Sequence, residues 1–150
     1  MTARTNITLI TIMLISVSAS FARGEDLKKV LEKFKKGEAV LLDVREEVEW
    51  KKGHLAGATL APFSKIAFDP ECRKIIAALP PGKEVYTYSS TGKRAFFAAN
   101  YLQDRNGQPA TALKVTYQAM LAAGFKAADL RPKGFLQQLK EQEEKDLGKK

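Results

Sequence analysis

The sequence of 150 residues contains only one cysteine, Cys72, and only one histidine, His54. A single cysteine excludes an internal disulfide, so the fold has to be stabilised by its hydrophobic core. Zinc sites usually combine several cysteine and histidine side chains, and one of each, far apart in sequence, makes a poor start for such a site. We therefore expect neither a metal site nor a cofactor. Cys72 is either buried, or available to react or to bridge two chains.

The net charge of +8 is not gathered in one block of the sequence. The basic residues are diluted by 17 acidic residues and show no regular interleaving with aromatic residues. Lysines stand among acids even in the most basic stretch, residues 25–36. A basic balance can attract nucleic acid or anionic membranes, but this mixed pattern indicates a solvated basic surface, and we expect no nucleic-acid partner.

An uncharged apolar run near the N-terminus, Ile7 to Val17, follows a single basic residue, Arg4. Small residues come next, and Ser20-Phe21-Ala22 is the best small-x-small cleavage site of a secretory signal peptide. The run is too short for a normal membrane span of roughly 20 residues, so a retained anchor is the weaker alternative. We predict a signal peptide over residues 1–22 and a periplasmic or secreted protein. Contact with the membrane is then limited to this segment before cleavage.

Short apolar runs alternate with amphipathic segments along the rest of the chain. This alternation predicts one α/β domain with a mostly parallel central sheet flanked by helices. Strands are expected over residues 39–42, 58–61, 85–88 and 112–115, and helices over 25–36, 71–79, 93–104 and 117–123. A loop with one helical turn at 46–51 is expected over residues 46–56. We predict that the domain spans residues 23–130 and that a charged C-terminal helix or tail follows over 131–150.

A polar loop stands between the third predicted strand and its following helix: Ser89, Ser90, Thr91, Gly92, Lys93 and Arg94. The end of a parallel strand facing a helix N-terminus is the usual ligand position in an open α/β sheet, and backbone amides there can converge on an anion. Gly92 permits a tight turn, and Lys93 and Arg94 add positive charge. These residues predict an anion-binding loop, with an ordinary polar loop as the alternative.

Two motifs are similar to those of rhodanese-homology domains. The loop resembles their active-site pattern, Cys-x-x-Gly-x-Arg followed by a small residue, with Gly92, Arg94 and Ala95 in register and Ser89 on the cysteine. The segments Leu42-Asp43-Val44-Arg45-Glu46, Glu49-Trp50 and Gly53-His54-Leu55-Ala56-Gly57-Ala58 resemble the family's other signature, which runs Asp-Val-Arg-x-x-x-Glu, an aromatic residue, then x-x-Gly-His-Ile-x-Gly-Ala.

This resemblance covers roughly residues 27–125 and implies a single rhodanese-like domain. It implies that Asp43 and Arg45 support the loop and that His54 is structural. The chain departs from the family at Val115-Thr116, where a Gly-Gly pair is usual, and at Met120, where tryptophan is usual. We therefore expect the part of the ligand pocket that these residues form to differ in shape from that of typical family members.

A serine at position 89 changes the chemistry that the resemblance implies. A typical member carries a sulfane sulfur as a persulfide on the loop cysteine, which requires a thiolate. A serine hydroxyl forms no persulfide and needs an adjacent base to act as a nucleophile. We therefore expect no catalytic residue, and a module that binds a small oxyanion or a periplasmic protein through the Ser89–Arg94 loop rather than an enzyme.

Two enzymatic alternatives stay open on the sequence. One is an active thiosulfate or sulfane-sulfur transferase that uses Cys72 or another route, because Cys72 stands at the start of a predicted helix beside Arg73 and Lys74, which favour a thiolate. The other is a phosphatase-like hydrolase, which the short loop disfavours.

Overall fold

The computed structural model describes residues 26–131. The predicted signal peptide over residues 1–22 and, apart from residue 131, the predicted C-terminal helix or tail over residues 131–150 lie outside the described residues. The elements follow in the order α1 Leu27–Lys35, β1 Ala39–Asp43, α2 Glu47–Lys52, β2 Thr59–Leu60, α3 Pro70–Ala77, β3 Glu84–Tyr88, α4 Lys93–Asn106, β4 Ala110–Ala112 and α5 Tyr117–Ala122. No helix in this part of the chain is long and apolar enough to cross a membrane.

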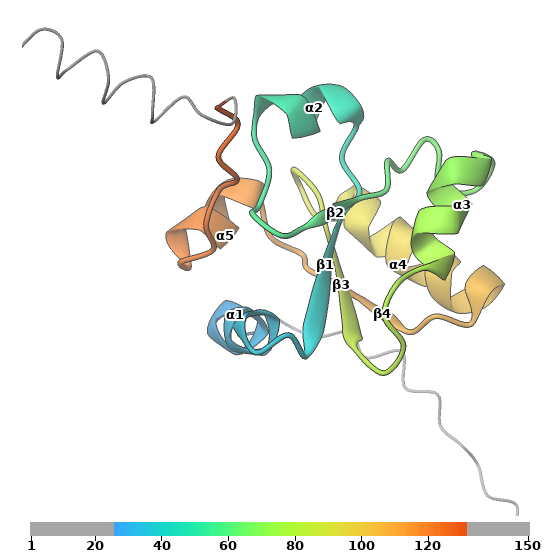
Figure 1. Ribbon diagram of the computed structural model, residues 1–150, viewed down its shortest axis with the longest axis horizontal. Coiled ribbons are helices and arrows are strands. Elements are labelled where there is room, and N and C mark those ends of the chain that lie inside the picture. The colour runs from blue at the N-terminus through green and yellow to red at the C-terminus, as the bar shows by residue number, and fades with distance from the viewer. Residues whose placement is uncertain (1–25, 132–150) are drawn as a thin grey trace, which may run out of the picture.

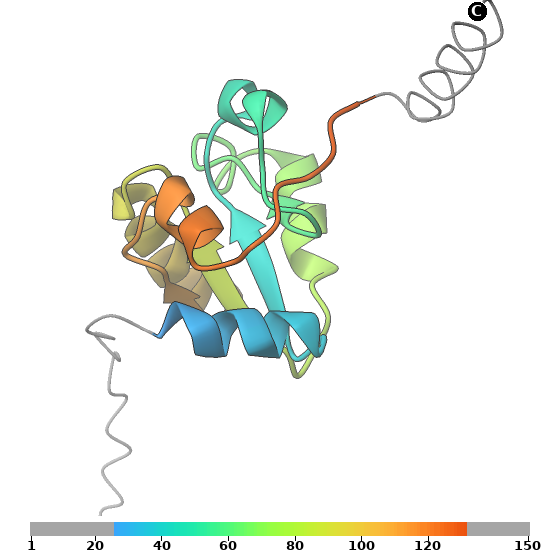
Figure 2. The same ribbon diagram turned by 90° about the vertical axis from the view of Figure 1, so that its left-hand side faces the viewer.

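The four strands form one parallel sheet in the order β2-β1-β3-β4, with helices packed against both faces (Figures 1 and 2). The predicted α/β architecture is therefore confirmed. Strands β1 and β3 pair along their whole length, from Ala39 beside Glu84 to Asp43 beside Tyr88. Because both strands end at the same edge, this register places the residues that follow Asp43 next to the residues that follow Tyr88.

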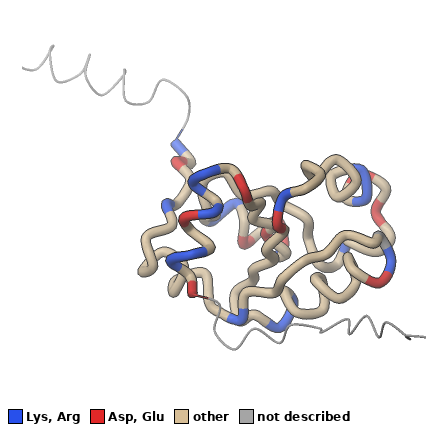
Figure 3. The backbone as a smooth tube through the Cα atoms, turned by 90° about the horizontal axis from the view of Figure 1, so that it is seen from below, with Lys and Arg blue, Asp and Glu red and all other residues tan. Residues whose placement is uncertain are grey.

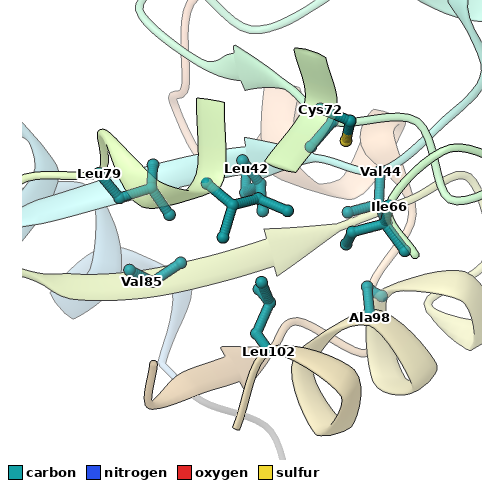
Figure 4. Close-up of a cluster of buried hydrophobic side chains, with 11 residues drawn as sticks. Leu42, Val44, Ile66, Cys72, Leu79, Val85, Ala98 and Leu102 are labelled. Atoms are coloured by element: carbon teal, nitrogen blue, oxygen red, sulfur yellow. The ribbon is translucent and has the colours of Figure 1, made fainter. Parts of the chain in front are cut away.

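Alternate residues of the central strands face two separate cores, as the period-two geometry of a strand requires. Helices α3 and α4 cover one face, where Leu42 and Val85 pack with Cys72, Ile76 and Leu102 (Figure 4). Helices α1 and α5 cover the other, where the buried residues are Val30, Ala39, Leu41, Leu55, Tyr86, Tyr88, Leu113, Met120 and Phe125. Because both faces of the sheet are buried at β1, the sequence of this strand is a continuous apolar run before Asp43.

The fourth strand is the element whose predicted bounds are wrong. It was expected over residues 112–115 but runs from Ala110 to Ala112. The backbone amide of Leu113 still donates to the carbonyl of Thr87 at 2.8 Å, and the chain then leaves the sheet. It leaves where the loop before α4 packs closely against the backbone of Lys114.

Acidic and basic residues are interspersed along the described chain (Figure 3). Several pair across elements, such as Lys33 of α1 with Glu84 of β3 at 2.7 Å. The largest concentration of buried charge lies at the carboxyl end of the sheet, where Asp43 and Arg45 are buried beside Tyr88.

Candidate functional site

The Ser89–Arg94 loop lies at the carboxyl edge of the sheet, between the end of β3 and the start of α4 (Figure 1). The backbone amide of Val44 donates to the carbonyl of Tyr88 at 3.1 Å, which ties the segment after β1 to the start of the loop. The two sequence motifs, residues 42–58 and 89–95, therefore meet at one place.

Ser89 organises the loop from inside. Its side chain is fully buried, and its Oγ accepts hydrogen bonds from the amides of Gly92, at 3.0 Å, and Ala95, at 3.3 Å. Thr87, two residues earlier, donates its hydroxyl to the carbonyl of Ala95 at 2.8 Å. These bonds fix the path of the chain from β3 into α4.

Four amides of the loop stay available to a ligand. Among the hydrogen bonds between described residues, the amides of Ser90, Thr91, Lys93 and Arg94 have no acceptor. The last two belong to the first turn of α4, whose 14 residues align their peptide dipoles with the positive end at the loop. Amides in this position are suited to bind an anion.

Gly92 is required by the loop's geometry. Its φ of +80° lies in the left-handed region, and a Cβ at this position would lie 2.9 Å from the Cα of Lys114. A real Cβ cannot approach backbone that closely, so a larger residue would push the loop away from the segment between β4 and α5. This contact lies beside Val115-Thr116, where Thr116 Oγ1 caps α5 by accepting from the amide of Ala119 at 3.1 Å.

Arg94 does not present an uncompensated positive charge. Its guanidinium donates to both carboxylate oxygens of Glu49, at 2.7 and 2.9 Å, and to Ser90 Oγ at 2.5 Å. Glu46 lies 4.0 Å away. The hydrogen bonds from Arg94 lower the pKa of Glu49 to about 2, and those bonds to Glu49 raise the pKa of Arg94. The loop therefore offers its backbone amides and the Lys93 ammonium group to a ligand, while the carboxylate of Glu49 in α2 balances the charge of Arg94.

Asp43 and Arg45 form a buried ion pair next to the loop. Arg45 Nη2 donates to Asp43 Oδ2 at 2.6 Å and to the carbonyl of Gly53 at 2.8 Å. The guanidinium lies 4.4 Å from the ring centroid of Tyr117 and 5.7 Å from that of Tyr88. The Nε and Nη2 groups of Arg45 are both bonded within this buried cluster, so the pair is held in place beside the loop.

Tyr88 belongs to the same buried cluster. Its hydroxyl accepts from the amide of Leu55 at 3.3 Å. Burial, and then the negative charge of Asp43, raise the pKa of Tyr88 far above its usual range. The phenol is therefore protonated at every physiological pH and does not serve as a base.

His54 contacts Trp50 rather than Ser89. Its ring stacks on the indole of Trp50 with centroids 3.5 Å apart, and its Nδ1 lies 3.0 Å from the carbonyl of Trp50. Its own carbonyl accepts from the amide of Ala128 at 2.8 Å. No hydrogen bond within the described residues joins His54 to Ser89.

The structure buries Cys72, which agrees with the first of the two expectations for this residue and disfavours the alternative in which it forms a thiolate. Cys72 is 2% exposed and packs in the core under α3 (Figure 4). Burial, and then the charge of Asp69, raise the pKa of its thiol. The basic neighbours in the sequence do not outweigh these effects, because the side chain points into the core. Within residues 26–131, no group of three or more His, Cys, Asp or Glu side chains is placed to hold a metal ion.

The sequence pattern did not identify Glu49 and Ser90 as the partners of Arg94. Glu49 belongs to the longer motif, so its position was visible, but the partner that it binds depends on the approach of α2 to α4. Ser90 was assigned to the loop only as a possible anion ligand, whereas its hydroxyl accepts from Arg94.

Comparison with protein families and solved structures gives a consistent result. The family model described as rhodanese-like domain matches residues 26–128. A rhodanese-related protein from Thermoplasma volcanium is 22% identical, with 68% of this chain and 93% of that chain covered and a TM-score of 0.55. A Helicobacter pylori protein is 25% identical, with 61% and 79% covered and a TM-score of 0.51.

A thiosulfate sulfurtransferase from Pseudomonas aeruginosa is 20% identical, with a TM-score of 0.57. The match covers 70% of this chain but only 20% of that one. At these identities the likeness concerns the fold. No curated protein matches the sequence.

Proposed function

Because the chain belongs to the family of rhodanese-like domains, we propose that it is a non-catalytic member, which binds a small oxyanion through the amides of the Ser89–Arg94 loop. In this proposal Ser89 occupies the position of the family's active-site cysteine. The loop keeps its shape and its donors, and the sulfur nucleophile is replaced by a hydroxyl.

The surroundings of Ser89 support the absence of sulfur transfer. A serine nucleophile needs a base within hydrogen-bond reach, whereas Ser89 Oγ accepts from two amides and has no basic partner among the described hydrogen bonds. Cys72 is buried in the core, and the pKa of its thiol is raised. Neither side chain is therefore suited to carry a persulfide.

The observation that carries the proposal is the set of loop amides without acceptors, those of Ser90, Thr91, Lys93 and Arg94. Unpaired amides at the N-terminus of a long helix bind oxyanions without further cationic groups. Since Glu49 balances the charge of Arg94, we expect weak binding that becomes stronger when this carboxylate is neutralised.

Calorimetric titration of the purified chain with sulfate, thiosulfate and phosphate tests this function. Glu49→Gln should tighten binding roughly fivefold, because removal of a nearby negative charge contributes about 1 kcal/mol. Glu47→Gln is the matched control, since it removes the same charge from the same helix at a residue that pairs with Lys65. Absence of binding to all three anions, or equal effects of both variants, would refute the proposal.

An active sulfurtransferase that uses Cys72 is the alternative function. Thiosulfate-to-cyanide transfer by the purified chain, followed by loss of that transfer in Cys72→Ala, would establish it. The proposal predicts no transfer above the uncatalysed rate in either protein.

Export remains part of the proposal and depends on the Ile7–Val17 run and the Ser20-Phe21-Ala22 site. N-terminal sequencing of the protein recovered from a bacterial periplasm should begin at Arg23. An intact Met1 would contradict cleavage.

A further inference from the structure

An aromatic cluster, formed by Phe63, Phe96 and Phe97, reaches the surface of the domain at Phe97, while Phe63 and Phe96 are partly buried. The ring centroid of Phe97 is 5.5 Å from that of Phe96 and 6.5 Å from that of Phe63. Phe97 nevertheless keeps 58% of its surface exposed. Phe63 comes from the segment after β2 and the other two from α4, so the tertiary structure assembles this cluster from separate parts of the chain.

The cluster is continuous with the anion-binding loop. The amide of Phe96 donates to the carbonyl of Gly92 at 3.0 Å. Next to Phe63, the hydroxyl of Ser64 donates to Glu46 at 2.7 Å, and Glu46 lies 4.0 Å from Arg94. The amide of Phe63 donates to the carbonyl of Val44 at 3.2 Å, so the segment that carries Phe63 lies beside the segment that follows β1 at this edge of the sheet.

Positive charge lies on both sides of the cluster. Lys93 is exposed and precedes Phe97 by four residues, so both side chains lie on one face of α4. Lys114 Nζ lies 5.5 Å from the ring centroid of Phe96. The nearby cations of Arg94 and Lys65 are balanced by carboxylates of α2. Beside the exposed ring of Phe97, the surface therefore carries the exposed ammonium group of Lys93.

An inorganic oxyanion would use the amides and leave the exposed ring of Phe97 in water. A ligand with an apolar group beside its negative charge would use both features, since covering an exposed ring is favourable. We propose, on the basis of the proposed function, that this site binds an acidic peptide segment of a partner protein. A carboxylate occupies the loop amides near Lys93, and an aromatic or aliphatic side chain packs on Phe97.

The spacing on α4 indicates the form of the peptide. Lys93 and Phe97 are four residues apart, which is roughly 6 Å along the helix axis. Side chains two residues apart in an extended peptide point the same way and are separated by about 6.6 Å. An acidic and an apolar residue with one residue between them therefore match the surface.

Titration of the ¹⁵N-labelled full chain with acetyl-Asp-Gly-Phe-Gly-amide, followed by amide NMR shifts, tests this inference. The peptide should bind about tenfold more tightly than the version with Ala for Phe, because the ring covers exposed apolar surface. Phe97→Ser should remove this preference and leave sulfate binding unchanged. Leu130→Ser is the control, because Leu130 is 49% exposed and lies beyond α5.

The outcomes separate this inference from the proposed function. Sulfate binding without a preference for the Phe peptide, or a preference that persists in Phe97→Ser, overturns the peptide site and leaves the anion site intact. Phe97-dependent binding that is equal for the Asp peptide and its Asn version overturns the carboxylate contact. Absence of sulfate and peptide binding overturns both proposals.

Discussion

Replacing Ser89 by cysteine measures how strongly the loop stabilises a negative charge. In a Cys72→Ala background the introduced thiol is the only one in the chain. Its sulfur would replace an oxygen that accepts from two amides, at 3.0 and 3.3 Å, next to the N-terminus of α4. The thiolate would therefore be a hydrogen-bond acceptor inside an anion-stabilising loop.

Two opposing effects decide the pKa of this thiol. Burial disfavours the thiolate, as it does at Cys72, where burial raises the thiol pKa. Two hydrogen bonds to the charged sulfur contribute about 1.5 kcal/mol each or more, and the helix N-terminus adds to them. We expect the second effect to exceed the first and to lower the pKa by about two units from roughly 8.5, which corresponds to about 2.7 kcal/mol.

The assay is the pH dependence of thiolate absorbance near the ultraviolet edge. At pH 7 a pKa near 6.5 makes about three quarters of the thiol ionised, against about 3% for an unperturbed cysteine. A midpoint at or above that of an unperturbed thiol would refute the assignment of an anion-stabilising loop.

Three further predictions concern stability and access. Gly92→Ala should cost about 2 kcal/mol or more in urea unfolding, because of its positive φ and the backbone opposite, whereas Gly107→Ala, with φ +60° and open space around it, should cost about 1 kcal/mol. Equal costs for the two variants would contradict the close approach of Gly92 to the backbone of Lys114. Glu49→Gln should lower stability at pH 7 by about 1 kcal/mol, allowing for partial solvent screening of its pair with Arg94. Folding lowers the pKa of Glu49 from 4.5 to about 2. The stabilisation that Glu49 gives is therefore complete above pH 4.5 and disappears as the pH falls towards 2, so the free energies of unfolding of wild type and variant should converge near pH 2. Cys72 should resist iodoacetamide in the native protein and react only after unfolding, since it is 2% exposed; rapid native alkylation would show that α3 opens.

Much of the fold could be predicted because its signals are local. The continuous apolar run before Asp43 and the β-rich run before Ser89 both became central parallel strands. The helix after Gly92 and the helix after Thr116 start where predicted. The bounds of β4 were wrong because residues 112–115 have a weak strand pattern, and the packing of the loop against Lys114 ends the pairing there.

The candidate site was predicted less completely than the fold. Both motifs were visible in the sequence, and so were Asp43 and Arg45 as residues near the loop. The sequence left open whether Cys72 is buried or reactive. Charged neighbours in the sequence do not determine the direction of its side chain, which the packing of α3 decided. The ion pair of Arg94 with Glu49 was not predicted either, since it depends on how α2 and α4 approach each other.

The sequence alone determined the alternation of strands and helices, the glycine at the tight turn and the hydroxyl at position 89, because each is set by residue type and local spacing. Only the tertiary structure decided where the side chains lie. It buried Cys72, balanced Arg94 with Glu49 and brought Phe63 beside Phe97. These contacts join residues far apart in the chain, and their geometry comes from packing two helical layers on one sheet.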